Sequence, residues 1–237
     1  EVAKLLNMSI VDEIQIMRKA VIDGSVTSGF QRTMLIGRNG KIKTSLGEIH
    51  IESLCLEEEA AKKLSESENL VTYRLDRLGV ALLEITTAPE IKNPEHAKEC
   101  ASIIGMILRS TEKVKRGIGT IRQDVNLSVK GHPRVEIKGF QDLKSMPKVI
   151  ENEVNRQLKE VKMNVALKSE VRKAEPDFTT NFLRPTPGAA RMYPETDHKP
   201  IIITDEFLDK VEKPELITER ALSLEKKYNL SSVLALE

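Results

Sequence analysis

The sequence has 237 residues, of which 40% are hydrophobic and 31% are charged, and its formal net charge is +1. This length allows one large domain or two small ones, and the near-zero net charge excludes a strong global field that would attract nucleic acid. Aromatic residues make up only 3% and Trp is absent, so stacking on nucleobases cannot be a widespread binding strategy.

Compartment signals in the sequence point to the cytoplasm. No apolar run is long enough to span a membrane, and no signal peptide is visible. The two cysteines, Cys55 and Cys100, do not form the pattern of a disulfide framework, which favours a reducing compartment. We therefore expect a cytoplasmic protein without a membrane partner. Because the first residue is Glu1 and not Met, we also expect the natural N-terminus to lie outside this sequence.

The N-terminal segment, residues 1–23, fits either an amphipathic helix or a strand from Met17 to Ile22. Residues 23–32 are small and hydrogen-bonding, which predicts a loop. Such a loop can bring backbone N–H groups close to an anion, although its letters match no known phosphate-binding pattern and a plain connection is the more common meaning.

Residues 33–56 predict a strand-rich meander with turns at Asn39-Gly40 and at Leu46-Gly47-Glu48. Three carboxylates follow, Glu57-Glu58-Glu59, and by themselves they suit the start of a helix, where they would stabilise its positive end.

The segment Val80–Ile85 is almost continuously apolar, which predicts a strand covered on both faces. Glu84 interrupts it, and a buried carboxylate needs a cation, a metal ion or a proton. Arg74 and Arg77, just upstream, could supply that cation in a structural ion pair. The residues alone leave the ion pair and a functional site as equal alternatives.

Amphipathic patterns predict helices from Pro94 to about Val114, from Pro147 to about Val161 and from Pro214 to Tyr228. Ile201–Ile203 predicts a short buried strand. Together with the strands upstream, these segments predict an α+β fold, with an antiparallel sheet and flanking helices.

Residues 117–141 predict a β-hairpin, because two runs of alternating apolar and polar residues flank a turn at Gly131-His132-Pro133. Side chains alternate along a strand, so the polar residues of both runs would share one face. That face would carry Arg122, Asp124, Asn126, Arg134, Glu136 and Lys138.

This polar face has two interpretations. It could be the solvated outer face of an antiparallel sheet, which is the commoner case. It could also be a polyanion site, because Arg suits phosphate and neighbouring carboxylates suit a bridging metal ion. Its mixed signs argue against a plain nucleic-acid stripe, which would be mostly basic.

Common catalytic motifs are absent. The four histidines are scattered, neither cysteine lies in a Cys-x-x-Cys, and no serine elbow, Walker loop or dinucleotide fingerprint is present. The carboxylates and arginines on strands that remain would suit the positioning of Mg²⁺ and a nucleotide, with the substrate supplying the nucleophile.

A family resemblance is carried by several segments in order: LCLEEEAAK (54–62), YRLDRLGVALLEITTAPEI (73–91), GTIRQDVNLSV (119–129), RVEIKGF (134–140) and RMYPETD (191–197). With them the chain resembles the GatB/GatE family of tRNA-dependent amidotransferases over nearly its whole length. The segments GSVTSGFQRT (24–33) and FLRPTPGAARMYPETD (182–197) favour the archaeal branch over the bacterial one.

The resemblance implies a cradle-shaped catalytic domain over residues 1–212 and the start of a C-terminal helical domain over 213–237. It implies that ATP and Mg²⁺ serve to phosphorylate the side chain of glutamate misacylated on tRNA(Gln). Ammonia from a partner of the amidotransferase, an asparaginase-like amidase chain, would then displace the phosphate. The expected assembly is a hetero-oligomer that binds Glu-tRNA(Gln).

The resemblance also implies roles for particular residues. Glu57 and Glu84 match the family's glutamates that hold Mg²⁺. The hairpin would supply the catalytic residues Arg122, Asp124, Glu136 and Lys138. Cofactor-binding residues would be Ser28, Gln31 and Arg32, in the loop matched to the mouth of the ammonia tunnel, together with Asn126 and Arg134.

Two departures from the family pattern stand out. The GLEVH-like strand, which supplies Glu and His metal ligands near the family's N-terminus, is missing, so we expect an incomplete metal site. The helical stretches expected at 158–163 and 164–171 abut, and we expect an insertion domain to be missing near 163–166. The alternative to an enzyme is a non-catalytic tRNA-binding module with the same fold, and the presence of Glu57 and Glu84 favours the enzyme.

Overall fold

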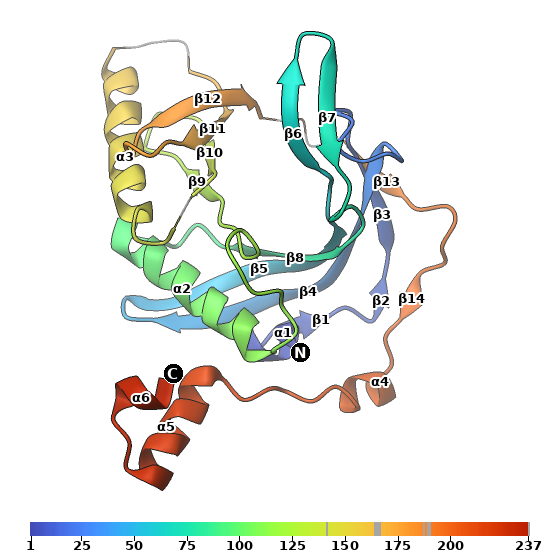
Figure 1. The fold of residues 1–237 in the computed structure, drawn as a ribbon, viewed down its shortest axis with the longest axis vertical. Coiled ribbons are helices and arrows are strands. Elements are labelled where there is room, and N and C mark those ends of the chain that lie inside the picture. The colour runs from blue at the N-terminus through green and yellow to red at the C-terminus, as the bar shows by residue number, and fades with distance from the viewer. Residues whose placement is uncertain (141, 164–166, 187, 189–190, 237) are drawn as a thin grey trace. The chain divides into compact units, whose positions relative to one another are not determined.

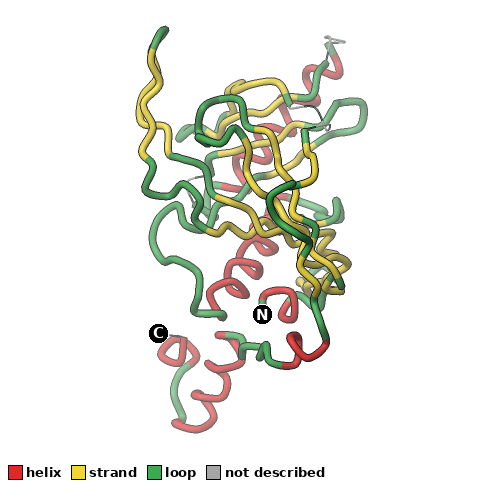
Figure 2. The backbone as a smooth tube through the Cα atoms, turned by 90° about the vertical axis from the view of Figure 1, so that its right-hand side faces the viewer, coloured by secondary structure: helices red, strands yellow, loops and turns green. Residues whose placement is uncertain are grey.

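The computed structural model describes residues 1–140, 142–163, 167–186, 188 and 191–236 (Figure 1). The chain divides into two compact units. Unit 1 comprises Glu1–Ile42, Glu48–Glu90 and Gly188–Lys213, and unit 2 comprises Lys43–Gly47, Ile91–Pro187 and Pro214–Glu237. In the described residues, the long helices belong to unit 2, whereas unit 1 consists mainly of strands. Figure 2 distinguishes helices, strands and loops by colour.

The principal sheet of unit 1 has the order β13-β3-β4-β5-β8, and β1 also pairs with β4. Its strands are β1 (Ser9–Ile10), β3 (Ile16–Ala20), β4 (Phe30–Thr44), β5 (Gly47–Glu58), β8 (Ala81–Thr87) and β13 (Met192–Pro194). The remaining elements are α1 (Val2–Leu5), α4 (Asp205–Asp209), the pair β2 (Glu13–Ile14) and β14 (Ile201–Ile202), and the pair β6 (Lys62–Ser67) and β7 (Leu70–Arg74).

The sheet of unit 2 has the order β12-β11-β10-β9. Its strands are β9 (Val125–Leu127), β10 (Val135–Lys138), β11 (Glu170–Ala174) and β12 (Thr180–Pro185), and its helices are α2 (Pro94–Ser110), α3 (Met146–Lys162), α5 (Ile217–Tyr228) and α6 (Ser232–Leu236). The β10–β11 pair is parallel and the other two are antiparallel. A parallel pair requires a crossover, which α3 provides.

The core of unit 2 lies between this sheet and its helices. Val135 and Ile137 on β10 pack with Val149 on α3 in one buried cluster, and Met146 and Ile150 of α3 belong to another. The apolar face of the β9–β10 hairpin is therefore covered, and its polar residues point the other way.

The α+β class, with antiparallel sheets and flanking helices, is confirmed. The hairpin and the helices predicted from Pro94, Pro147 and Pro214 are also present, as β9–β10, α2, α3 and α5. The start of α2 follows from its sequence: the side chain of Asn93 accepts a hydrogen bond from the backbone N–H of His96, and Pro94 occupies the first turn. The hairpin strands are shorter than expected, since residues 121–124 lie outside β9.

The turn predicted at Asn39-Gly40 is wrong, because both residues lie inside β4. The segment after α1 crosses this strand: the N–H of Lys41 donates to the carbonyl of Leu6 at 2.8 Å. A Cβ atom at Gly40 would lie 2.5 Å from Met8 Cγ. The Asn-Gly pair therefore serves a close crossing rather than a turn, whereas the second predicted turn does connect β4 to β5.

The segment Val80–Ile85 is a strand, as predicted, but it is not covered on both faces. β8 is the edge strand of the sheet, and Ala81, Leu83 and Glu84 are exposed. The suggested helix start at Glu57-Glu58-Glu59 is also wrong, because Glu57 and Glu58 end strand β5.

Of the two alternatives for the N-terminal segment, the structure contains the strand, as β3. Three further expectations differ from the structure. Residues 30–32 of the expected loop already belong to β4. Ile201 and Ile202 form a strand but are exposed. The helix expected at 164–171 is absent from residues 167–171, where β11 begins at Glu170, and the rest of it lies outside the described residues. No helix in the described ranges is both long and apolar enough to cross a membrane.

Candidate functional site

Glu57 and Glu84, the predicted metal ligands, lie on the same face of neighbouring strands in unit 1. In the β5–β8 register, Glu84 is opposite Cys55, and Cys55 is two residues from Glu57. Residues two apart on a strand share a face, so the two carboxylates are diagonal neighbours with Cα atoms about 7–8 Å apart. The pKa of the Cys55 thiol is raised by burial and then by the charges of Glu84 and Glu57.

The two carboxylates differ in their surroundings. Glu57 is 5% exposed, whereas Glu84 is exposed on the edge strand. Glu57 Oε1 lies 2.5 Å from Lys19 Nζ and accepts a hydrogen bond from Thr33 Oγ1 at 3.2 Å. Glu57 is therefore held in place by a cation from β3 and a hydroxyl from β4.

The suggested partners of Glu84 are engaged elsewhere. Arg74 Nε lies 2.8 Å from a carboxylate oxygen of Asp76. Arg77 Nε donates to the carbonyl of Ala60 at 2.9 Å, and it lies 4.0 Å from Glu59. Both arginines thus have contacts with groups other than Glu84, and the structural ion pair remains an alternative explanation for Glu84.

The donor set of Glu57 and Glu84 fits Mg²⁺. Both residues offer hard carboxylate oxygens, and Mg²⁺ is commonly held by one or two carboxylates, with waters and substrate phosphates completing its shell. Across the described residues, no group of three or more His, Cys, Asp and Glu side chains could hold a metal ion. The pair would therefore need further ligands from water or substrate.

Gln31 and Arg32, both predicted to bind the cofactor, point to opposite faces of β4. Gln31 is opposite Lys19 and donates to the carbonyl of Glu58 at 2.6 Å, so it shares the face of Glu57. Arg32 is opposite Arg18, and its Nη1 lies 3.0 Å from Glu58 Oε1. The side chains of consecutive residues in a strand point to opposite faces. Only Gln31 therefore shares a face with Glu57 and Glu84.

Ser28 lies in the loop before β4 and is exposed. Its hydroxyl donates to the carbonyl of Phe30 at 2.9 Å. Gly29 has a φ of +76° and its N–H donates to the carbonyl of Val26 at 3.0 Å. The loop thus contains local hydrogen bonds, and the carbonyl of Ser25 also accepts one from the N–H of Ala61 at 2.8 Å.

The face that bears Arg32 contains a cluster around Glu195, whose side chain is 0% exposed. Glu195 accepts hydrogen bonds from Arg18 Nε at 2.8 Å and from Arg32 Nε at 2.7 Å. The backbone N–H groups of Thr196 and Asp197 also donate to it. The arginine hydrogen bonds, foremost that of Arg18, hold the pKa of Glu195 far below its usual range.

Three of the four predicted catalytic residues of the hairpin, Asp124, Glu136 and Lys138, come together in unit 2. Asn126 is opposite Glu136 in the β9–β10 register. Lys138 Nζ lies 2.7 Å from Glu136 Oε1 and 2.5 Å from Asp124 Oδ2. Burial lowers the pKa of Lys138, but the charge of Asp124 and the hydrogen bonds outweigh this and raise it. Arg122 and Arg134 are exposed.

The structure thus gathers the predicted residues into two groups. The first comprises Glu57, Glu84 and Gln31 in unit 1, and the second comprises Asp124, Asn126, Glu136 and Lys138 in unit 2. If these residues act in one reaction, Arg122, Asp124 and Glu136 should line the same cavity as Glu84, and this stays a prediction.

Sequence reasoning missed Lys19 and Glu195. Lys19 lies in the stretch that fitted either a helix or a strand, and only strand pairing brings it to Glu57. Glu195 lies in RMYPETD, a segment that contributed to the resemblance without an assigned role. The presence of Glu195 in a segment that carries the family resemblance was the one sequence feature that could have indicated its importance.

The chain has an α+β fold with carboxylate and basic residues gathered on its sheets, and its sequence matches a known family of catalytic domains. Residues 1–209 match the family described as the GatB/GatE catalytic domain. The chain therefore belongs to the GatB/GatE catalytic-domain family.

Its curated relatives include archaeal glutamyl-tRNA(Gln) amidotransferase subunits E. That of Methanocaldococcus jannaschii is 58% identical over 168 residues, covering 71% of this chain and 27% of the relative. That of Archaeoglobus fulgidus is 35% identical over 354 residues, covering 95% and 58%. That of Methanosarcina barkeri is 36% identical over 366 residues, covering 99% and 58%.

The chain thus spans about a quarter to three fifths of the length of these relatives. The match to the M. barkeri protein, at 366 residues, is also longer than the 237 residues of this chain. That relative therefore contains internal residues without a counterpart here. The expected site of the missing insertion includes residues 164–166, which lie outside the described residues, and it stays a prediction.

Proposed function

We propose that this chain is the catalytic part of an ATP-dependent ligase that converts Glu-tRNA(Gln) to Gln-tRNA(Gln). ATP would phosphorylate the side-chain carboxylate of the misacylated glutamate, and ammonia would displace phosphate from the acyl phosphate. The names of the relatives support the reaction class. The observation that carries the proposal is the β5–β8 register, which puts Glu57 and Glu84 on one face.

In this reaction the main task of the protein is to orient the reactants and to neutralise charge. Glu57 and Glu84 would hold Mg²⁺, which when bound offsets the negative charge of the phosphates. Lys19 Nζ lies 2.5 Å from Glu57 Oε1 and would compete with the metal ion for this oxygen. Gln31 lies on the same face and offers an amide to a bound ligand.

The hairpin would contribute the basic and amide groups that meet ATP. Arg122 and Arg134 are exposed and suit bidentate contacts to phosphate. Lys138 is kept charged between Asp124 and Glu136. Asn126 would contact the nucleotide as a neutral donor and acceptor.

The proposed assembly is a cytoplasmic hetero-oligomer. An asparaginase-like amidase chain of the same enzyme would produce ammonia and deliver it through a tunnel, near whose mouth the loop with Ser28 would lie. Glu-tRNA(Gln) would be the second partner. The relatives' designation as subunits E supports a multi-subunit enzyme.

A non-catalytic tRNA-binding module with the same fold is the alternative. Such a module would need the sheet but not the carboxylate pair. The retention of Glu57 and Glu84 on one face therefore favours the enzyme.

The deciding experiment is Glu84→Gln in the assembled amidotransferase. We expect loss of ATP-dependent phosphorylation of Glu-tRNA(Gln), with tRNA binding nearly unchanged, because the amide removes one anionic metal ligand. Glu66→Gln, on the exposed hairpin β6–β7, is the matched control. Full phosphorylation by the Glu84 variant would refute the metal assignment, and absence of phosphorylation by the wild type would favour the tRNA-binding module.

A further inference from the structure

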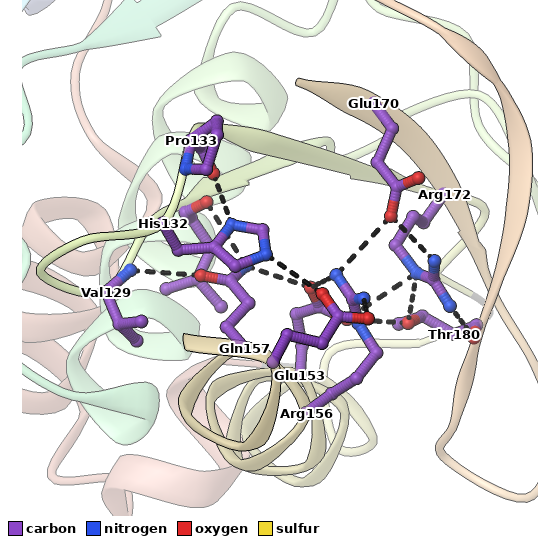
Figure 3. A network of polar contacts seen from close by, with 11 residues as sticks. Val129, His132, Pro133, Glu153, Arg156, Gln157, Glu170, Arg172 and Thr180 are labelled. Carbon is purple, nitrogen blue, oxygen red and sulfur yellow. Dashed lines mark hydrogen bonds and ion pairs between the residues drawn. The ribbon is translucent and has the colours of Figure 1, made fainter. Parts of the chain in front are cut away.

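Helix α3 carries a buried side-chain amide that contacts the hairpin backbone (Figure 3). Gln157 is 0% exposed. Its Oε1 accepts a hydrogen bond from the N–H of Val129 at 3.0 Å, and its Nε2 donates to the carbonyl of Leu127 at 3.5 Å. One side chain of the helix thus satisfies two backbone groups at the end of β9, which would be costly to leave unpaired in the interior.

Glu153, one helical turn earlier, fixes the orientation of this amide. Glu153 is 1% exposed, and its Oε1 accepts a hydrogen bond from Gln157 Nε2 at 2.9 Å. An ionised carboxylate can only accept hydrogen bonds, so Gln157 must turn its NH₂ toward Glu153 and its oxygen toward Val129. Glu153, together with the N–H of Val129 and the carbonyl of Leu127, therefore fixes the direction of the amide.

Several donors surround Glu153 and keep it ionised (Figure 3). Arg156 donates to its two oxygens at 2.7 and 2.9 Å, and Thr180 donates at 2.6 Å. Arg172 Nε lies 3.7 Å away. Burial raises the pKa of Glu153, but the hydrogen bonds from Arg156, Thr180 and Gln157 outweigh this and lower it.

The hairpin turn is tied to the same helix at a second point. His132 Nε2 lies 3.1 Å from Glu160 Oε2, and its Nδ1 lies 2.6 Å from the carbonyl of Pro133. Arg156 also donates to Glu160, at 2.6 Å. The strand end and the turn are thus both bound to α3 through polar contacts.

We propose that Gln157, oriented by Glu153, is a positioning residue that sets the hairpin for binding ATP. Asn126 precedes Leu127 on β9 and points to the opposite face, where it is paired with Glu136. Holding the backbone at Leu127 and Val129 therefore fixes the distance of the polar side chains, such as Asn126, from helix α3. Apolar packing alone would cover the hairpin without fixing the positions of these backbone groups. This inference rests on the proposed function.

The test is Gln157→Met in the assembled amidotransferase, with steady-state kinetics in ATP and in Glu-tRNA(Gln). Met fills a similar volume but offers neither amide group. We expect the KM for ATP to rise about tenfold, since about 1.4 kcal/mol corresponds to a factor of ten and lies within the cost of losing such a contact. The KM for Glu-tRNA(Gln) should not change. A merely structural role would lower kcat through loss of folded enzyme and leave both KM values unchanged.

Asn152→Leu is the matched control, because Asn152 lies on the same helix and its amide also bonds to a backbone carbonyl, that of Phe178, at 2.9 Å. Its KM for ATP should equal that of the wild type. Hydrogen exchange of the peptide 127–133 gives an independent readout, and it should be faster only in the Gln157 variant. If that variant does not fold, Glu153→Gln replaces it, with a smaller change in the same direction.

The outcomes are distinct. Wild-type activity with an unchanged KM for ATP in the folded variant overturns the positioning role alone. Unchanged exchange of residues 127–133 overturns the contact on which it rests. A wild-type assembly without ATP-dependent amidation overturns the proposed function, and this role with it.

Discussion

Lys19 and Glu57 form a largely buried ion pair, with 2.5 Å between Nζ and Oε1, at the position where the proposed metal ion would bind. Their side chains are 14% and 5% exposed. Because removing one partner of such a pair leaves an uncompensated buried charge, the proposed cation would be an alternative to the lysine as the partner of this carboxylate.

The first prediction follows from this competition. Lys19→Met should lower the free energy of unfolding by about 3 kcal/mol without metal, the scale of a broken buried pair. Millimolar Mg²⁺ should restore part of this loss, because a cation can then neutralise Glu57. The measurement is thermal unfolding with and without MgCl₂.

Lys41→Met is the control for this prediction, since Lys41 pairs with Glu48 at 3.3 Å and both side chains are more than one third exposed. Its stability should change by less than about 1 kcal/mol and should not depend on Mg²⁺. Equal Mg²⁺ dependence in both variants would contradict the assignment of Glu57.

Arg122→Ala should lower kcat/KM for ATP. The decrease should correspond to about 1–3 kcal/mol of lost transition-state stabilisation, the scale of a lost charge-assisted hydrogen bond. The control is Lys148→Ala, because Lys148 is an exposed cation on α3. ATP kinetics equal to those of the wild type in the Arg122 variant would return the hairpin to the interpretation of a solvated sheet face.

Much of the fold could be predicted because its signals are local. Pro94 at the start of α2 and the alternation of Val135, Glu136, Ile137 and Lys138 each involve neighbours in sequence. Asn39-Gly40 gave an equally strong local signal and was wrong, because contact with the N-terminal segment decides its role. Local propensity is overridden where a distant segment packs closely.

The site was predicted only in part, for the same reason. Glu57 and Glu84 were named through the resemblance, and the structure places them on one face. Their environment was not predictable: Lys19 is 38 positions from Glu57, and Glu195 is 177 positions from Arg18. Such partners meet only through strand pairing. The burial of Glu84 was overestimated because an apolar run does not distinguish an edge strand from a central one.

Gly40→Ala should destabilise the protein by about 1–3 kcal/mol, the usual cost of overpacking. The added Cβ would lie 2.5 Å from Met8 Cγ and 2.8 Å from the carbonyl oxygen of Leu6, so the crossing segment must shift. Gly105→Ala in α2 is the control, since its Cβ would lie 3.4 Å from Arg109 Nη1. That change should stabilise the helix by roughly 0.5–1 kcal/mol. Denaturant unfolding distinguishes the two.

The last prediction concerns acid pH and Glu195. The hydrogen bond from Arg18, followed by the other donors, depresses the pKa of Glu195 in the folded state, whereas the unfolded value is about 4.3. A group with a depressed folded pKa contributes stability that is complete above the unfolded pKa and is lost as the pH falls toward the folded one. Glu195→Gln cannot titrate, so the stability difference between wild type and variant should be constant from about pH 6 to 7 and narrow below about pH 4. Thermal unfolding measured at several pH values tests this, and a difference that stays constant down to about pH 3 would show that Glu195 is not selectively stabilised as a carboxylate.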